Sequence, residues 1–191
     1  MMKLLARVTL PLAAGALLLA GCTTVQPGTA SPAGSESAAP SSENSSSAAP
    51  GGASTDSLQP CTLLTAADVS GYASSFEPAT EKKLGGARVC SYQHKITDPS
   101  EEGMILSVAI RDTAPLASVN DTGNGVQDLQ VNGRAAKEAS SDAPLGCTVA
   151  LGVGDNARVD VNATALNTVE KACQIAKDLA EKTVEPKLPK A

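Results

Sequence analysis

Four cysteines, Cys61, Cys90, Cys147 and Cys173, constrain the fold of this chain more than any other feature. In an oxidised domain an even number of cysteines indicates two disulfides, and four cysteines allow three pairings. The sequential pairing, Cys61–Cys90 with Cys147–Cys173, closes loops of just under 30 residues, each contributing roughly 3.5 kcal/mol in the chain-entropy model. A metal site would need clustered spacing such as Cys-x-x-Cys, which the sequence lacks. We therefore expect two disulfides and no metal.

The compartment is indicated by a fifth cysteine, which closes the lipobox-like tetrapeptide Leu19-Ala20-Gly21-Cys22. Residues 1–21 have the form of a secretory leader, with Lys3 and Arg7 before an apolar run over residues 8–20. That run is shorter than the roughly 20 residues a transmembrane helix needs. We expect lipidation of Cys22 and cleavage before it, which anchors the protein at the extracytoplasmic face of the cell membrane. An ordinary signal-peptidase site that happens to end at a cysteine is the alternative.

A linker is expected over residues 22–56, following the lipidated Cys22. Of the 34 positions in 23–56, 28 are Ser, Ala, Pro, Gly or Thr. Such a segment buries too little apolar surface to offset its conformational entropy, so we expect it to be disordered. As a flexible coil it spans about 30 Å. The folded domain is expected over residues 57–191.

Charge and aromatic content exclude several classes of ligand. The formal net charge is −5, and loss of Lys3 and Arg7 with the leader makes it −7. The absence of a basic cluster argues against nucleic acid, whose binding requires Lys and Arg at the phosphates, and against a second, electrostatic contact with anionic lipid. The aromatic residues are Tyr72, Phe76 and Tyr92. We therefore expect an aliphatic core and no aromatic platform for sugars or bases.

Alternation of apolar and polar residues predicts an antiparallel sheet. Strands are expected over residues 88–96, 104–110, 147–153 and 157–162. Asn132-Gly133 is a strong signal for a two-residue hairpin turn. Pro115 is expected to open a short helical turn.

Helices are expected at the two ends of the domain. Thr65 followed by Asp68 has the form of a capping box that opens a short helix. Asn167 is the expected N-cap of the C-terminal helix, which Pro186 ends, and Cys173 lies on its apolar stripe. A bridge from Cys173 to Cys147 would join that helix to the sheet. The predicted fold is therefore α+β, with one antiparallel sheet of about five strands, an N-terminal and a C-terminal helix packed on one face, and two disulfides.

Short motifs throughout the domain resemble a known family. They are Pro60-Cys61-Thr62-Leu63-Leu64-Thr65, Cys90-Ser91-Tyr92, Gly133-Arg134-Ala135-Ala136, Cys147-Thr148-Val149, and Cys173 with Ala176, Leu179-Ala180 and Leu188-Pro189. Together they resemble the actinobacterial lipoproteins that contain domain of unknown function 3558. The resemblance implies a secreted lipoprotein domain whose function is not settled, and it supplies no catalytic residues.

Candidate sites are few. His94 is the only histidine, so serine or cysteine catalysis would have to use it, but we interpret it as an ordinary exposed histidine. Residues 121–125, Asp-Thr-Gly-Asn-Gly, lack the ligand spacing of an EF-hand and are interpreted as a flexible surface loop. Gly152-x-Gly154 is expected at a hairpin turn, which excludes a phosphate loop.

Two further residues are given structural interpretations. Arg134 is expected to pair with a carboxylate across strands, the alternative being contact with a partner. Tyr92 is expected to pack against the first disulfide and to place its hydroxyl at the surface.

Three classes of function follow from these expectations. The first is a non-enzymatic, monomeric module of the envelope that binds a protein partner, a cell-wall ligand or a lipid, without a cofactor. The second is a structural subunit of an envelope complex, and the third is a hydrolase. An apolar cavity would favour a ligand, a flat apolar patch a protein partner, and a cleft joining His94 to Asp and Ser an enzyme.

Overall fold

A computed structural model of the chain describes residues 53–164 and 166–190. The expected leader, Cys22 and nearly all of the expected linker lie outside these residues. The last residues assigned to the linker do contact the domain, because Thr55 is buried and its hydroxyl donates to Asp112 at 2.7 Å. The packed part of the chain therefore begins before the expected boundary at residue 57.

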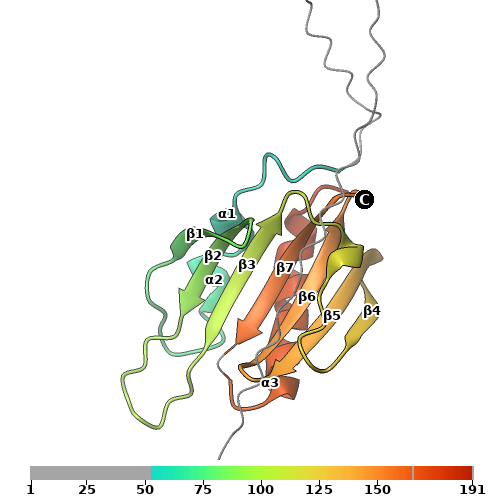
Figure 1. The fold of residues 1–191 in the computed structure, drawn as a ribbon. Coiled ribbons are helices and arrows are strands. Elements are labelled where there is room, and N and C mark those ends of the chain that lie inside the picture. Colours follow the sequence, from blue (N-terminus) through green and yellow to red (C-terminus); the bar gives the residue numbers. More distant parts are fainter. Residues whose placement is uncertain (1–52, 165, 191) are drawn as a thin grey trace, which may run out of the picture. The chain divides into compact units, whose positions relative to one another are not determined.

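A single antiparallel sheet forms the centre of the domain (Figure 1). It has seven strands in the order β1-β2-β3-β7-β6-β5-β4, not about five. The strands are β1 Thr80–Leu84, β2 Ala87–Gln93, β3 Ile105–Arg111, β4 Val126–Val131, β5 Arg134–Asp142, β6 Leu145–Val153 and β7 Ala157–Thr164. The antiparallel sheet is confirmed and the strand count is corrected.

β1 is a strand that the alternation of apolar residues does not reveal. Three of its five residues are charged, and all five are exposed. The strand therefore has no buried apolar face. It pairs with β2 through a turn at Gly85 and Gly86, whose φ angles are 55° and 78°. Two consecutive positive φ values match a type I′ hairpin, which favours glycine at both positions.

The hairpin between β4 and β5 forms at Asn132-Gly133, as predicted. Asn132 has φ 51° and Gly133 has φ 84°, again the type I′ geometry. Val131 pairs with Arg134 directly across this turn. The turn residues thus set the register of both strands.

Two single-turn helices, α1 Pro60–Leu63 and α2 Ala66–Val69, lie at the N-terminal end of the domain, where the sequence predicts one short helix after Thr65. The predicted capping box opens α2, because the Thr65 side chain accepts from the Asp68 backbone N–H while Asp68 accepts from the Thr65 backbone N–H. The helix ends after Val69, since Ser70 and Gly71 have low helix propensity. The 3₁₀ turn η1, Leu116–Ser118, follows Pro115 as expected.

The C-terminal helix α3, Val169–Leu179, begins one residue later than expected. Its N-cap is Thr168, whose hydroxyl accepts from the Lys171 N–H at 3.2 Å, and not Asn167. A π-helical turn, η2 Ala180–Val184, and a 3₁₀ turn, η3 Glu185–Lys187, extend the helix. Pro186 lies in η3. In the part of the chain that the structure describes, no helix combines the length and apolarity needed to cross a membrane.

One face of the sheet is closed by the helices. Cys90, Val108, Val161 and Val149 are paired in a row across β2, β3, β7 and β6, so their side chains share that face. Helices α1 and α3 pack on it and complete an aliphatic core. We call this the helix face.

Two disulfides join the helices to the sheet. Cys61 in α1 is bonded to Cys90 in β2, and Cys147 in β6 is bonded to Cys173 in α3. Each disulfide therefore fixes one helix to the strand beneath it.

Candidate ligand-binding face

The opposite side of the sheet, which we call the open face, carries small polar side chains. Paired positions form a row across six strands: Thr80, Ser91, Ser107, Asn162, Thr148 and Ala139. Hydroxyl and amide groups donate and accept hydrogen bonds, and in this row they point away from the helix face.

A crossover segment, residues 112–125, covers part of the open face. It leaves β3, runs over β7, β6 and β5, and reaches the far edge of the sheet at β4 (Figure 1). Leu116 of the crossover packs over Gly152, where an added Cβ would lie in ordinary van der Waals contact with the Leu116 side chain at 3.5 Å. Thr122 donates to the Ser140 carbonyl at 2.7 Å and fixes the other end of the crossover to β5.

The open face of β1, β2 and β3 lies outside the crossover and forms a groove of about 500 Å³. Its lining is Glu77, Pro78, Thr80, Lys82, Leu84, Val89, Ser91, Gln93, Ile105 and Ser107. The groove thus mixes an apolar floor with hydroxyl, amide and charged groups. Further hollows of about 130 and 400 Å³ lie along the same face, near Asn162 and Thr148.

A charged cluster lies between the groove and the crossover. Arg111 and Arg158 are paired across β3 and β7, and both donate through Nε to the buried carboxylate of Asp160. Arg158 also donates to the carbonyl of Pro115 and the hydroxyl of Ser118, at 2.9 and 2.6 Å. These bonds attach the crossover to the centre of the sheet.

His94 is buried, not exposed as expected. Residues 74–77 cover its ring, because Phe76 forms a β-bridge with it and Ser74 Oγ lies 3.3 Å from Nε2. The Glu102 carbonyl oxygen lies 2.8 Å from Nδ1. Ser74 also donates to Glu101 at 3.2 Å, and N–H groups of Thr97 and Asp98 hold the pKa of that carboxyl below its ordinary value.

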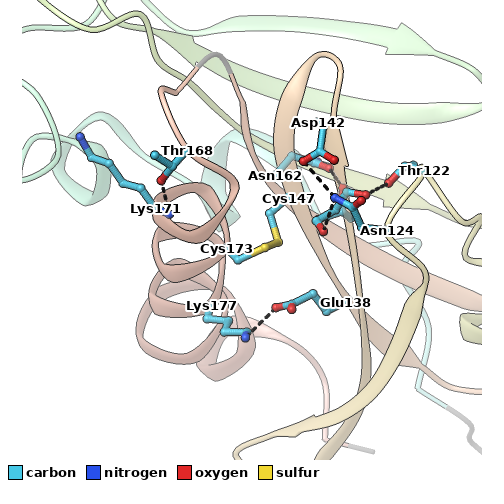
Figure 2. Close-up of a disulfide and its surroundings, with 12 residues drawn as sticks. Thr122, Asn124, Glu138, Asp142, Cys147, Asn162, Thr168, Lys171, Cys173 and Lys177 are labelled. Atoms are coloured by element: carbon cyan, nitrogen blue, oxygen red, sulfur yellow. Dashed lines mark hydrogen bonds and ion pairs between the residues drawn. A yellow bond between two sulfur atoms is a disulfide. The ribbon is translucent and has the colours of Figure 1, made fainter.

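The disulfide Cys147–Cys173 has a carboxylate beside it. One oxygen of Glu138 and the two sulfurs lie within 4.8 Å of one another (Figure 2). Lys177, one turn after Cys173 on α3, places Nζ 2.8 Å from Glu138 Oε2 as an ion pair. The sulfurs are bonded to each other and so are not thiolate ligands. We interpret the cluster as the attachment of α3 to β5 and β6.

Arg134 pairs with a carboxylate, but with one near the C-terminus and not across strands. Its Nε donates to Glu185 at 3.1 Å, while its other nitrogens donate to the carbonyls of Gly152 and Pro189 at 2.9 and 2.7 Å. A single side chain thus holds the β4–β5 hairpin, β6 and the last residues together.

Tyr92 is buried together with its hydroxyl, which donates to the Leu64 carbonyl at 3.4 Å. Burial, with Asp68 nearby, raises the pKa of the Tyr92 phenol. The expectation of a surface hydroxyl is therefore wrong, because the turn between α1 and α2 covers the ring. Tyr72 is half-buried against the core, and its hydroxyl donates to Asp178 at 2.8 Å.

The two glycine-rich segments are turns. Asp121 accepts from the N–H groups of Gly123 and Gly125, at 2.8 and 2.9 Å, and these bonds hold the pKa of its carboxyl below the ordinary value. The segment is a surface loop whose acidic side chain is directed at its own backbone. Gly154 lies in the turn between β6 and β7, as expected.

Comparison with known proteins identifies the family. The family model described as "Protein of unknown function (DUF3558)" matches residues 17–186, which is most of the chain. No curated protein and no solved structure matches the chain significantly. The chain therefore belongs to this family of proteins of unknown function, the one that its sequence motifs indicate.

Proposed function

We propose that the protein is a lipoprotein of the cell envelope whose domain binds a cell-wall polymer through the open face. Lipid on Cys22 would anchor it outside the cell membrane, consistent with the lipobox that ends there. The Ser- and Ala-rich segment that follows would act as a flexible spacer of about 30 Å. The domain would then reach into the wall while its chain stays on the membrane.

The observation that carries this proposal is the difference between the two faces of the sheet. The helix face is closed by helices and two disulfides, while β1–β3 leave an uncovered groove of about 500 Å³. The groove is lined by hydroxyl, amide and charged groups as well as by apolar side chains, unlike the predominantly apolar cavities that hold lipid chains. A polymer rich in hydroxyl and amide groups matches this lining.

Recognition would depend on hydrogen bonds and not on aromatic stacking. Ser91, Ser107, Asn162 and Thr148 are only partly buried and lie in one line across four strands. Each hydrogen bond to a solvated ligand contributes little by itself. A repeating polymer can satisfy several along the row, and many copies of the domain on one membrane would add avidity.

Co-sedimentation with purified cell walls tests the proposal. The mature chain carrying Cys22→Ser should sediment with intact walls and stay in solution without them. Ser107→Arg, which places a long side chain in the groove, should reduce sedimentation at least tenfold. Gln174→Arg, an equal change at an exposed position of α3, is the matched control. Equal sedimentation of the two variants, or none by the unsubstituted chain, would contradict binding through the open face.

A second function, hydrolysis, is favoured by one contact, that of Ser74 with His94. Nδ1 of His94, held by a carbonyl, would carry the ring proton and leave Nε2 free to accept from the serine. Against this, the third group is a backbone carbonyl, and the serine proton is shared with Glu101. Labelling by a fluorophosphonate probe that Ser74→Ala abolishes would support an enzyme, and absence of labelling would count against one.

A further inference from the structure

Two arginines and one aspartate meet at the centre of the open face, where β3 pairs with β7. Arg111 and Arg158 are directly opposite each other, an arrangement of like charges that is unfavourable by itself. Asp160 lies two residues along β7 on the same face, and each arginine donates to a different oxygen of its carboxylate. One carboxylate balances one guanidinium, so the group keeps a single positive charge.

Both arginines retain unused donors. Nη1 of Arg158 is bonded to the crossover, and Nη1 of Arg111 donates to the Gly85 carbonyl at 3.3 Å. Within residues 53–164 and 166–190, Nη2 of neither arginine makes a hydrogen bond. The Arg158 side chain is 7% exposed, and its Nη2 is not among the fully buried unpaired atoms of the described residues, so this donor reaches solvent at the surface of the cluster. An acceptor from outside the chain can therefore pair with it without displacing a bond within the chain.

The space that the cluster faces is a hollow of about 130 Å³, which we call the arginine hollow. Arg111, Arg158 and Asp160 form one side of it, and Val119, Asn120, Thr122, Ala139, Thr148 and Asn162 form the rest. Thr148 donates to Asn162 at 2.7 Å, so the order of donors and acceptors along this wall is fixed. The hollow is small, polar and positively charged.

We propose that the arginine hollow binds a singly charged oxyanion group, a carboxylate or a phosphodiester, on the polymer that occupies the open face. The inference rests on the proposed function and names the charged group that the face selects. A guanidinium fork matches two oxygens on one centre, which both groups present. The net charge of +1 in the cluster matches one negative charge and disfavours a second.

Because the protein is acidic overall, an anion would be held in the arginine hollow by short-range contacts and not by long-range electrostatic attraction. The mature chain is acidic, so its long-range field repels anions, but salt screens that field beyond about 8 Å at physiological ionic strength. Binding would therefore depend on the short bonds made inside the hollow. Changes in salt concentration around the physiological value should therefore alter the affinity for the oxyanion less than removal of one arginine does.

Titration with small oxyanions tests the inference. Acetate and dimethyl phosphate are added separately to the oxidised mature chain carrying Cys22→Ser, at constant ionic strength balanced with chloride, and backbone amide resonances are followed by NMR. At least one probe should produce saturable shifts at residues 111 and 158–162, and the two titrations distinguish carboxylate from phosphodiester. Arg111→Gln should weaken this binding at least tenfold.

A matched variant separates the site from general charge effects. Lys137→Gln removes one positive charge from the open face, where Lys137 is paired in register with Ala150 and Asp160, but it lies outside both the groove and the arginine hollow, so the affinity of this variant for the probes should stay within twofold of the unsubstituted chain. If Arg111→Gln lowers the melting temperature markedly, Arg111→Lys keeps the charge but not the planar fork, and should still weaken binding several-fold. Arg158 is left unchanged because it also holds the crossover.

The outcomes are distinct for the two proposals. Absence of saturable shifts with both probes, or equal weakening by Lys137→Gln and Arg111→Gln, would overturn the oxyanion site. Full sedimentation of Arg111→Gln with cell walls would also overturn its role in polymer binding while leaving the open face as the binding surface. Failure of the unsubstituted chain to sediment, with probe binding intact, would overturn the proposed function alone.

Discussion

Replacing Arg134 by Met tests whether one buried ion pair holds the C-terminus on the sheet. The Arg134 side chain is 4% exposed and its partner Glu185 is 16% exposed. The substitution keeps the apolar stem but removes three hydrogen bonds, to Glu185, Gly152 and Pro189. It leaves the carbonyls of Gly152 and Pro189 without this donor and leaves the Glu185 carboxylate with the Asn132 amide, which donates at 3.1 Å, but without a counter-charge.

The expected loss follows from that environment. Removing one partner of a buried ion pair typically costs about 3–5 kcal/mol, since the other charge stays behind without compensation. A domain of this size loses about 3–4 °C in melting temperature per kcal/mol. The Arg134→Met variant should therefore melt roughly 9–20 °C below the unsubstituted protein.

Thermal unfolding followed by circular dichroism, with both disulfides intact, measures this difference. Lys137→Met on the same strand is the control, because the Lys137 ion pair is with Asp128, whose side chain is 87% exposed. Exposed pairs contribute about 0–1 kcal/mol, so the control should shift the melting temperature by no more than about 3 °C. Equal shifts for the two variants would refute the assignment of Arg134 as the attachment point of the C-terminus.

Three further predictions concern the disulfides, an acidic group and the anchor. Cys147→Ser with Cys173→Ser should destabilise the domain by roughly 2–5 kcal/mol in chemical denaturation, and a titratable thiol in the oxidised unsubstituted domain would contradict the pairing. Arg88 holds the pKa of the Asp112 carboxyl below its ordinary value, despite partial burial. The Asp112–Arg88 ion pair therefore stabilises the folded domain above pH 3.8, and this stabilisation is lost as acid protonates Asp112 in the folded form. Between about pH 7 and pH 3, the melting temperature of the unsubstituted protein should therefore fall further than that of the Asp112→Asn variant. Cys22→Ala should leave no stable membrane fraction, and unchanged fractionation would rule out the lipid anchor.

Local patterns predicted much of the sheet. Alternation places Leu106, Val108 and Ile110 on one side of β3, and all three are buried. Asn132-Gly133 forms the turn that such a pair favours, because both residues adopt positive φ at low cost. These features depend on neighbours in sequence and on the period of a strand, which are visible without a structure.

Strand β1 shows where that reasoning stops. Its residues, Thr80–Leu84, have no buried face, so no apolar period marks them. The signal that could have identified the strand is Gly85-Gly86, a two-residue hairpin turn next to the predicted β2. A turn signal can thus reveal an edge strand whose side chains carry no pattern.

The candidate site could not be predicted, because long-range contacts create it. Arg111 and Asp160 are separated by 49 positions and meet only because β7 pairs with β3. Their burial comes from the crossover, whose path over the sheet no local motif indicates. His94 is similar, since the segment that covers it, residues 74–77, is distant in sequence.

The strand order divides the domain into two parts that meet along a seam. Strands β1–β3 and strands β4–β7 each form a consecutive meander, and β3 pairs with β7 between them. Cys61–Cys90 lies within the first part and Cys147–Cys173 within the second, so neither disulfide crosses the seam. Each crosslink can therefore form before the two parts have met.

A cut in the crossover would consequently release the two parts from every covalent connection that the described residues make. The pieces would be held by the β3–β7 ladder and by side-chain contacts such as Lys187 with Asp68, at 2.9 Å. Two separately produced, individually oxidised fragments should thus reassemble through the β3–β7 pairing and these side-chain contacts, without a covalent link. The proposed oxyanion site would form only in the reassembled domain, because Arg111 comes from the first part and Arg158 and Asp160 come from the second.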